Sequence, residues 1–149
     1  MKRKIYLALL IFLLCGCTRS IPDKLSAFIS TALNKNNGVV DISKFDEIAW
    51  DRLYIIPPYA NAFYYDDLVI EYDREIEATG IESWDHKLVL LLFKEDKLVN
   101  LSDIDREVVD FGDAVRFPND DIILFYKKDE AVFPYIVDSK GYMRIQMKK

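Results

Sequence analysis

The sequence predicts an α+β domain in which a single twisted antiparallel sheet of about five to seven strands carries helices on one face. Two observations predict this class. An apolar stripe with helical spacing occupies residues 25–33, and the helical pattern stops before Gly38. From Gly38 onward the chain changes to short apolar runs bounded by Asp, Lys, Asn and Pro, which is typical of strands and turns. Because the connections are short, we expect antiparallel neighbours.

The first helix is expected between Ser20 and Gly38. Ser20 suits the N-cap, and Pro22 suits the first turn, where its missing N–H costs nothing. The apolar residues recur at i, i+3, i+4, i+7 and i+8, so they share one side of the helix. They are Leu25, Phe28, Ile29, Ala32 and Leu33. We expect this side to pack on the sheet.

The later elements follow from the same patterns. Strands are expected at Val39–Ile42, Ile48–Ile56, Lys87–Phe93, Lys97–Ile104, Asp121–Lys127, Ala131–Val137 and Tyr142–Met147. Three hairpins are expected, with turns at 94–97, 127–130 and 138–141, and Gly141 can supply a positive φ in the third. A second helix is predicted over Asp66–Thr79, ending at Gly80 and burying Leu68, Val69, Tyr72 and Ile76.

The first 17 residues have the parts of an export signal: a basic start at 2–4, an apolar run at 5–14 and small residues at 15–17. The alternative is a short transmembrane helix, but the apolar run is well below the ~20 residues that cross a bilayer. The quartet Leu14-Cys15-Gly16-Cys17 resembles the lipobox of bacterial lipoproteins. This resemblance implies cleavage before Cys17 and lipidation of its thiol. The chain then divides into a signal peptide (1–16), a lipidated N-terminus with a short tether (17–21) and one domain (22–149).

Cleavage at this place would change both thiols and charge. Cys17 would remain as the sole cysteine, so no disulfide is expected in the domain. The signal holds three of the 20 basic residues and none of the 25 acidic ones, which leaves 17 against 25 and a net charge of −8. Such a balance argues against nucleic acid and against an anionic lipid surface as partners. Thr18 follows the cysteine, and by resemblance to lipoprotein sorting this favours the outer membrane if the organism is Gram-negative.

Aromatic residues are dense between Trp50 and Tyr65. The pattern W-D-x-x-Y-x-x-x-P-Y at 50–59 resembles a segment of small, uncharacterised bacterial lipoproteins, and the resemblance implies no activity. Two interpretations stay open. In one, the rings form a ligand or partner surface that contains Trp50, Tyr54, Tyr59, Phe63, Tyr64 and Tyr65. In the other, which we prefer, Trp50 and Tyr54 belong to the core and residues 59–65 cover the end of a strand.

No catalytic, metal or cofactor site is predicted. His86 is the sole histidine, and we expect it at the surface or in a turn, with no second His to complete a triad or a zinc site. Acidic clusters could bind calcium or cleave glycosides. They are Asp66-Asp67, Asp103–Asp105, Asp110–Asp113 and Asn119–Asp121. The last two fall at predicted turns, where Asp and Asn are favoured for backbone reasons alone.

The sequence therefore predicts a non-enzymatic, membrane-anchored envelope lipoprotein that binds a protein partner near the membrane, as an inhibitor, an immunity protein or an accessory subunit. The acidic balance supports this prediction, because acidic surfaces steer basic partners. The alternative is a small glycan-binding domain or hydrolase that uses the aromatics of residues 50–65 with nearby carboxylates.

Overall fold

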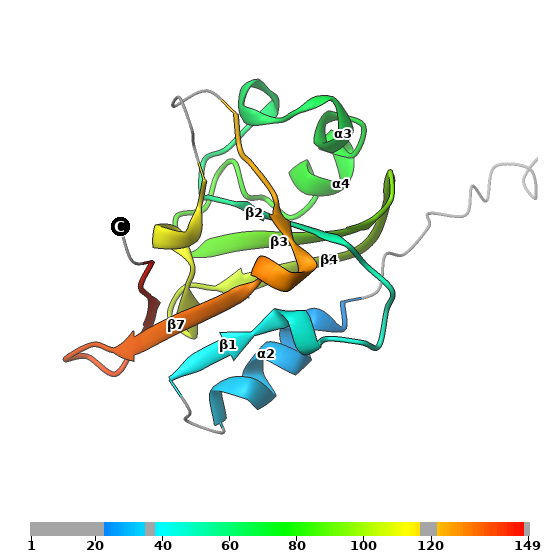
Figure 1. Ribbon diagram of the computed structural model, residues 1–149. Helices are drawn as coiled ribbons and strands as arrows, with labels where there is room; N and C mark the ends of the chain where they lie inside the picture. The colour runs from blue at the N-terminus through cyan, green and yellow to red at the C-terminus, as the bar shows by residue number, and fades with distance from the viewer. Residues whose placement is uncertain (1–22, 35–37, 117–121, 148–149) are drawn as a thin grey trace, which may run out of the picture.

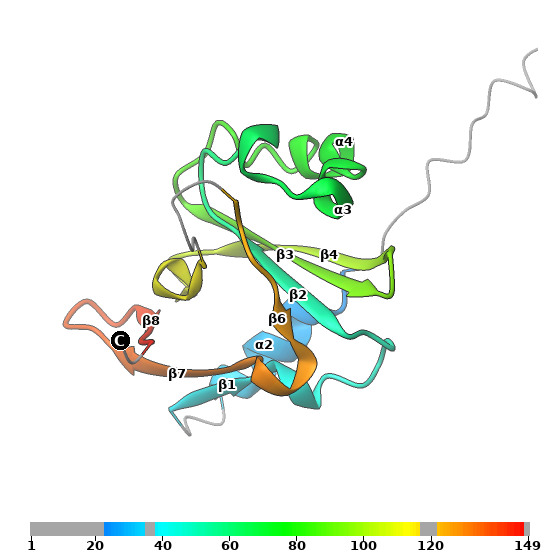
Figure 2. The ribbon, with the colours of Figure 1, turned by 45° about the horizontal axis from the view of Figure 1, so that its top comes forward.

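A computed structural model describes residues 23–34, 38–116 and 122–147. The predicted signal peptide, Cys17 and the tether lie outside the described residues. The chain has mixed helices and strands arranged around two four-stranded sheets, so the α+β class is confirmed. The prediction of one larger sheet is wrong. Figures 1 and 2 show one sheet crossing the middle of the molecule, with helices α3 and α4 on one side and helix α2 with the second sheet on the other.

The central sheet has the strand order β4-β3-β2-β6, and every neighbouring pair in it is antiparallel. Its strands are β2 (Arg52–Ile56), β3 (Lys87–Lys94), β4 (Lys97–Asp105) and β6 (Tyr126–Lys127). Strand β3 is buried on both faces because its side chains alternate between two hydrophobic cores. Leu88, Leu90 and Leu92 face one core, whereas Val89, Leu91 and Phe93 face the other.

The first core lies between the central sheet and a second layer of the molecule. We call this second layer the lower layer and define it as α2 together with the second sheet. The layer contains α2 (Leu25–Asn34), β1 (Val39–Asp41), β5 (Val109–Asp110), β7 (Val132–Val137) and β8 (Met143–Ile145). The sheet order is β1-β7-β8-β5, and the pair β5/β8 is parallel. The predicted helical stripe packs as expected, because Leu25, Ile29 and Leu33 are buried in this core.

The start of α2 is tied to the edge strand β4 by a polar junction. Ser102 Oγ donates to Asp23 Oδ1 at 2.5 Å, and the Lys24 N–H donates to Asn100 Oδ1 at 3.1 Å. Asn100 Nδ2 in turn donates to Ser102 Oγ at 2.8 Å. Asn100 and Ser102 are fully buried, and these bonds satisfy them. The junction therefore fixes where the chain enters the domain, on the lower-layer side of the central sheet.

The second core lies under residues 57–86, which we call the cap. The cap contains η2 (Ala62–Tyr64), α3 (Asp67–Ile70) and α4 (Asp73–Glu77). Val69, Ile76 and Ile81 pack against the cap-facing side of the central sheet. The predicted helix Asp66–Thr79 is thus two short helices, since the backbone at Tyr72 leaves helical geometry with φ −112° and ψ 17°. The expectation that all helices share one face is also wrong, because α2 lies on the opposite side.

Two strand predictions need correction as well. The predicted hairpin across residues 127–130 does not form, because β6 pairs with β2 whereas β7 pairs with β1 and β8. The 3₁₀ turn η4 (Lys128–Glu130) instead carries the chain from one sheet to the other. The expected strands at 48–56, 121–127 and 142–147 are shorter, and Asp121 lies outside the described residues. Two further 3₁₀ turns, η1 (Ile42–Lys44) and η3 (Gly112–Ala114), complete the elements.

The other two hairpins form where they were predicted. Strands β3 and β4 turn at Glu95-Asp96, and β7 and β8 turn at residues 138–142. Gly141 adopts φ +88°, as a left-handed turn position requires. Asp138 Oδ1 accepts from the backbone N–H groups of Lys140 and Tyr142, which holds this turn.

Candidate functional site

The structure separates the aromatic residues that the sequence suggested as one surface. Trp50 is only 3% exposed and lies in the core between the central sheet and the lower layer, where its Nε1 donates to the Phe45 carbonyl at 2.8 Å. Tyr54 and Tyr65 are buried in the other core, beneath the cap. Trp50 and Tyr54 therefore lie in the interior, as the preferred interpretation expected, and on opposite sides of the central sheet.

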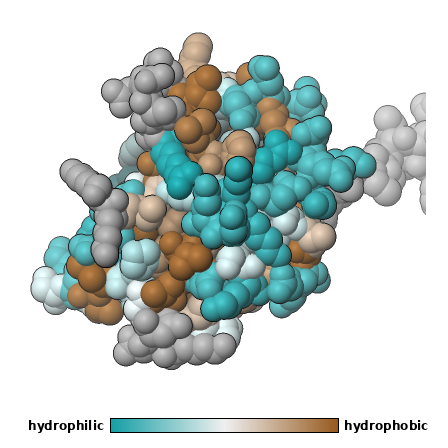
Figure 3. Space-filling model, in the orientation of Figure 1, coloured by the Kyte–Doolittle hydropathy of each residue, from teal (hydrophilic) through white to brown (hydrophobic). Residues whose placement is uncertain are grey.

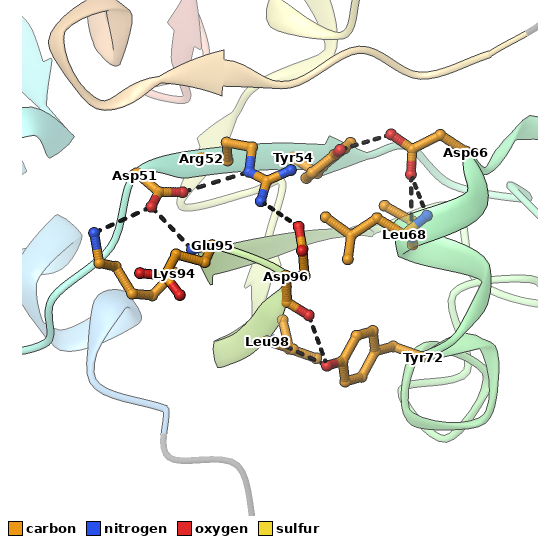
Figure 4. Close-up of polar contacts among 11 residues, drawn as sticks. Asp51, Arg52, Tyr54, Asp66, Leu68, Tyr72, Lys94, Glu95, Asp96 and Leu98 are labelled. Carbon is orange, nitrogen blue, oxygen red and sulfur yellow. Dashed lines mark hydrogen bonds and ion pairs between the residues drawn. The ribbon is translucent and has the colours of Figure 1, made fainter.

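Tyr54 links the central sheet to the cap (Figure 4). Its hydroxyl donates to Asp66 Oδ2 at 2.6 Å, and its ring packs against Phe93 with centroids 5.4 Å apart. Burial, reinforced by the Asp66 carboxylate, raises the pKa of Tyr54 well above its usual range. Asp66 Oδ1 also accepts from the N–H groups of Leu68 and Val69, so it caps α3. This carboxylate therefore has a structural role.

A second tyrosine clamps the cap to the β3–β4 hairpin (Figure 4). The Tyr72 hydroxyl accepts from the Leu98 N–H at 3.2 Å and donates to the Asp96 carbonyl at 3.4 Å. Its ring meets Phe93 edge-on at 5.4 Å. The same hairpin is also bonded to the residue that precedes β2, because Asp51 Oδ2 accepts from Lys94 Nζ and from the Glu95 N–H. The cap is thus seated on the sheet by polar contacts as well as by its core.

Three of these six aromatic side chains remain at the surface, all in the loop between β2 and α3. Phe63 is 91% exposed, Tyr59 is 58% exposed and Tyr64 is 37% exposed. The loop is ordered by hydrogen bonds: Tyr59 N donates to the Ile81 carbonyl at 3.0 Å, and Asn61 Oδ1 accepts from Phe63 N at 3.1 Å. Tyr59 adopts φ +62°, a left-handed conformation that is strained for a bulky residue. The fold therefore holds large apolar rings in water on a constrained loop.

Other apolar side chains extend this surface. The Ile123 N–H donates to the Tyr64 carbonyl at 2.9 Å, which brings the chain around Ile122 and Leu124 alongside the loop. These two residues are exposed, as are Ile70 on α3 and Trp84 at the end of the cap. Figure 3 shows apolar surface at the top of the molecule, over η2 and the chain leading to β6, beside the hydrophilic surface over α3.

The cap also carries an unbalanced charge. Residues 57–86 contain eight acidic residues and one basic residue, Arg74, which gives a net charge of −7. Among the described residues, the one cap carboxylate within ion-pair distance of a basic side chain is Asp85, whose Oδ1 lies 3.9 Å from His86 Nδ1. Outside the cap, most of the described carboxylates pair with Lys or Arg, as in Asp110 with Arg106 at 2.8 Å. The cap therefore presents negative charge that the described part of the fold does not neutralise.

The remaining predicted candidates have local partners. His86 is exposed, as expected, and its ring meets Trp84 edge-on at 5.3 Å. Asp103 pairs with Lys87 at 2.9 Å, and Asp110 Oδ1 accepts from the Gly112 N–H at 2.9 Å. The cluster Asn119–Asp121 lies outside the described residues. No group of three or more His, Cys, Asp or Glu that could hold a metal ion is found in the described ranges.

Sequence reasoning missed the cap as a unit. The exposed Ile70 and Trp84 were not among the expected surface residues, and the acidic side chains of α3 and α4 were noted only as the pair Asp66-Asp67. A count of charge by segment would have found the signal, because residues 57–86 alone carry more negative charge than the net −5 of the whole chain.

Comparison with protein-family models, with curated proteins and with solved structures found no match to this chain. Of the helices that the structure describes, none is long and apolar enough to span a membrane.

Proposed function

We propose that this protein is a lipid-anchored lipoprotein of the bacterial cell envelope that binds a protein partner near the membrane, without catalysing a reaction itself. The observation that carries the anchoring is the N-terminal quartet Leu14-Cys15-Gly16-Cys17 behind a basic and apolar leader. Lipid chains contribute roughly 0.8 kcal/mol for each buried methylene, so two or three chains on Cys17 would hold the domain firmly.

Partner binding is supported by the loop between β2 and α3. Exposed rings on a constrained loop lose little conformational entropy on binding, and large aromatic side chains supply much of the energy at protein interfaces. Phe63 is the strongest case, since it is 91% exposed and so contributes little to the core. The alternative, a glycan-binding domain or hydrolase built on all the aromatics of residues 50–65, is less well supported because Trp50, Tyr54 and Tyr65 are buried.

The anchoring is tested by a matched pair of cysteine variants in the full-length chain. Cys17→Ser should release the protein from membranes or leave an uncleaved precursor, whereas Cys15→Ser should leave processing and detergent partitioning unchanged. Intact-mass spectrometry of the membrane fraction distinguishes the two results. Unchanged mass and partitioning for Cys17→Ser would contradict the proposed anchoring.

A further inference from the structure

Among the exposed apolar surfaces of the described structure, the cap combines two properties that the others lack. Its rings stand on an ordered, strained loop, and its carboxylates have no described basic partner apart from His86 beside Asp85. The outward side of β7 is also apolar, with Val132 and Ile136 exposed. That strand, however, lies between β1 and β8, where Asp41 pairs with Lys44 and Arg144 pairs with Asp138. The carboxylates beside this strand are therefore already paired with basic side chains of the same chain.

From these observations we infer that the cap is the docking surface for the protein partner and that the partner presents Lys and Arg side chains to it. This inference rests on the proposed function and names the partner's chemistry. Cations stack on the faces of Tyr and Phe rings and are attracted by nearby carboxylates. The exposed rings at positions 59, 63 and 64 and the exposed carboxylates of Glu71, Glu75 and Glu77 supply both halves of that recognition.

The path of the chain agrees with this placement. Asp23, the first described residue, is bonded to Ser102, which faces the lower-layer core together with its partner Leu90. The described chain therefore begins on the side of the central sheet opposite the cap, where the predicted tether would join it. The same charge excludes two other occupants, because anionic lipid and nucleic acid would both be repelled. A cationic protein surface is the occupant that the cap fits.

The test is site-specific photo-crosslinking in native membranes with the full-length chain. The probe is p-benzoylphenylalanine placed at position 59 or 63 in the cap and, as the comparison, at position 132 or 136 on β7. We expect crosslinks from the cap positions to one protein, at a peptide rich in Lys or Arg. Phe63→Ala, with the probe at 59, should lower the yield about tenfold, the effect of losing about 1.4 kcal/mol, without loss of folding, since the ring is exposed.

Charge variants decide the chemistry of the partner. The triple variant Glu71→Lys, Glu75→Lys, Glu77→Lys should lower the crosslink yield at least about tenfold, since it replaces attraction by repulsion. The matched control Glu107→Lys, Asp113→Lys, Asp129→Lys reverses three exposed carboxylates outside the cap and should leave the yield unchanged. Thermal unfolding verifies that both variants fold.

Each outcome has one meaning. Crosslinks from 132 and 136 alone would overturn the cap assignment while the proposed partner binding stands. An unchanged yield in the cap triple variant, or crosslinks from the cap to a peptide without basic residues, would overturn the cationic partner. Absence of crosslinks at all four positions would contradict partner binding itself, while the result of the cysteine variants would still stand for the anchoring.

Discussion

The cap and the lower layer cover opposite faces of the same sheet, but they differ in how many of their carboxylates are paired with basic side chains. In the lower layer, Asp110 is held by Arg106 and Arg144, and Asp138 is held by Arg144. In the cap, seven of the eight carboxylates have no ion-pair partner among the described residues. Both regions bury continuous apolar cores, so packing does not explain the difference. The comparison indicates that the lower layer uses its charges to fasten the fold, whereas most of the cap carboxylates are left available to the proposed partner.

The largest effect is expected from the two cores themselves. Leu90 and Leu91 are fully buried neighbours in β3 that face the lower layer and the cap respectively. Leu90→Ala and Leu91→Ala should each lower the free energy of unfolding by about 2–5 kcal/mol, because each leaves a cavity. Urea titration measures the loss.

The same experiment shows whether the two regions unfold together. Trp50 reports on the lower core and Trp84 on the cap, so Trp84→Phe and Trp50→Phe leave one fluorescent reporter in each region. Coincident transitions are expected for a single cooperative unit. A cap that melts earlier, and more so in Leu91→Ala, would instead make the cap a separate unfolding unit.

Local patterns predicted the elements better than they predicted how the sheets assemble. The run Lys87–Phe93 was correctly predicted as a strand, because a strand buried on both faces is apolar along most of its length, and the β3–β4 hairpin followed from its short turn. The prediction of a single sheet failed at residues 128–130. There the short connection does not close a hairpin but leads from one sheet to the other. No periodicity distinguishes these two outcomes, since both need only a polar turn.

The candidate site shows the same limit. Pattern located the aromatic segment and placed Trp50 and Tyr54 in the core, but it did not distinguish the buried ring of Tyr65 from the exposed ring of Tyr64, because these neighbours differ only in the direction in which the fold turns them. The break at Tyr72 was equally hidden, since the residue belongs to an apolar helical stripe and its contacts are with the distant hairpin at Asp96 and Leu98. Long-range contacts decided both positions.

The next largest effect concerns the paired charge of the lower layer. Burial alone would raise the pKa of Asp110, but the Arg106 guanidinium and the Gly112 N–H outweigh it, so the pKa is lowered. The stability that this provides is present above the unfolded value of about 3.9 and is lost as pH falls through the lowered folded value. Asp110→Asn should cost about 1–3 kcal/mol at pH 7, and the difference from the unmodified protein should shrink below pH 4.

Urea titrations at pH 7 and pH 3 measure this dependence. Asp113→Asn, at an exposed position three residues away, is the control and should change stability little at either pH. A deficit in Asp110→Asn that stayed constant with pH would show that the residue acts through packing and not through its charge.

A pair of glycines compares backbone strain in the two regions. Gly80 (φ +77°) ends the α4 segment in the cap, and Gly141 (φ +88°) forms the β7–β8 turn. Alanine at either position pays about 1–2 kcal/mol for the left-handed backbone. A Cβ at Gly80 would also lie 2.8 Å from the Trp84 ring, whereas nothing lies near one at Gly141. Gly80→Ala should therefore be the more destabilising, as measured by thermal unfolding, and equal losses would show that Trp84 moves aside freely.

The smallest effect is the sharpest test of the comparison, because the two regions should respond with opposite signs. Glu77 lies four residues after Asp73 within α4, and such a like-charged pair costs about 0.2–0.5 kcal/mol in helices. Glu77→Gln should therefore stabilise the protein slightly. Asp41→Asn in the lower layer removes the partner of Lys44, 2.7 Å away, and should destabilise by up to about 1 kcal/mol. Both differences should shrink in 1 M salt, since screening weakens repulsion and attraction alike. If Glu77→Gln destabilised the protein instead, this cap carboxylate would be fastening the fold, and the basis for assigning it to a partner would be lost.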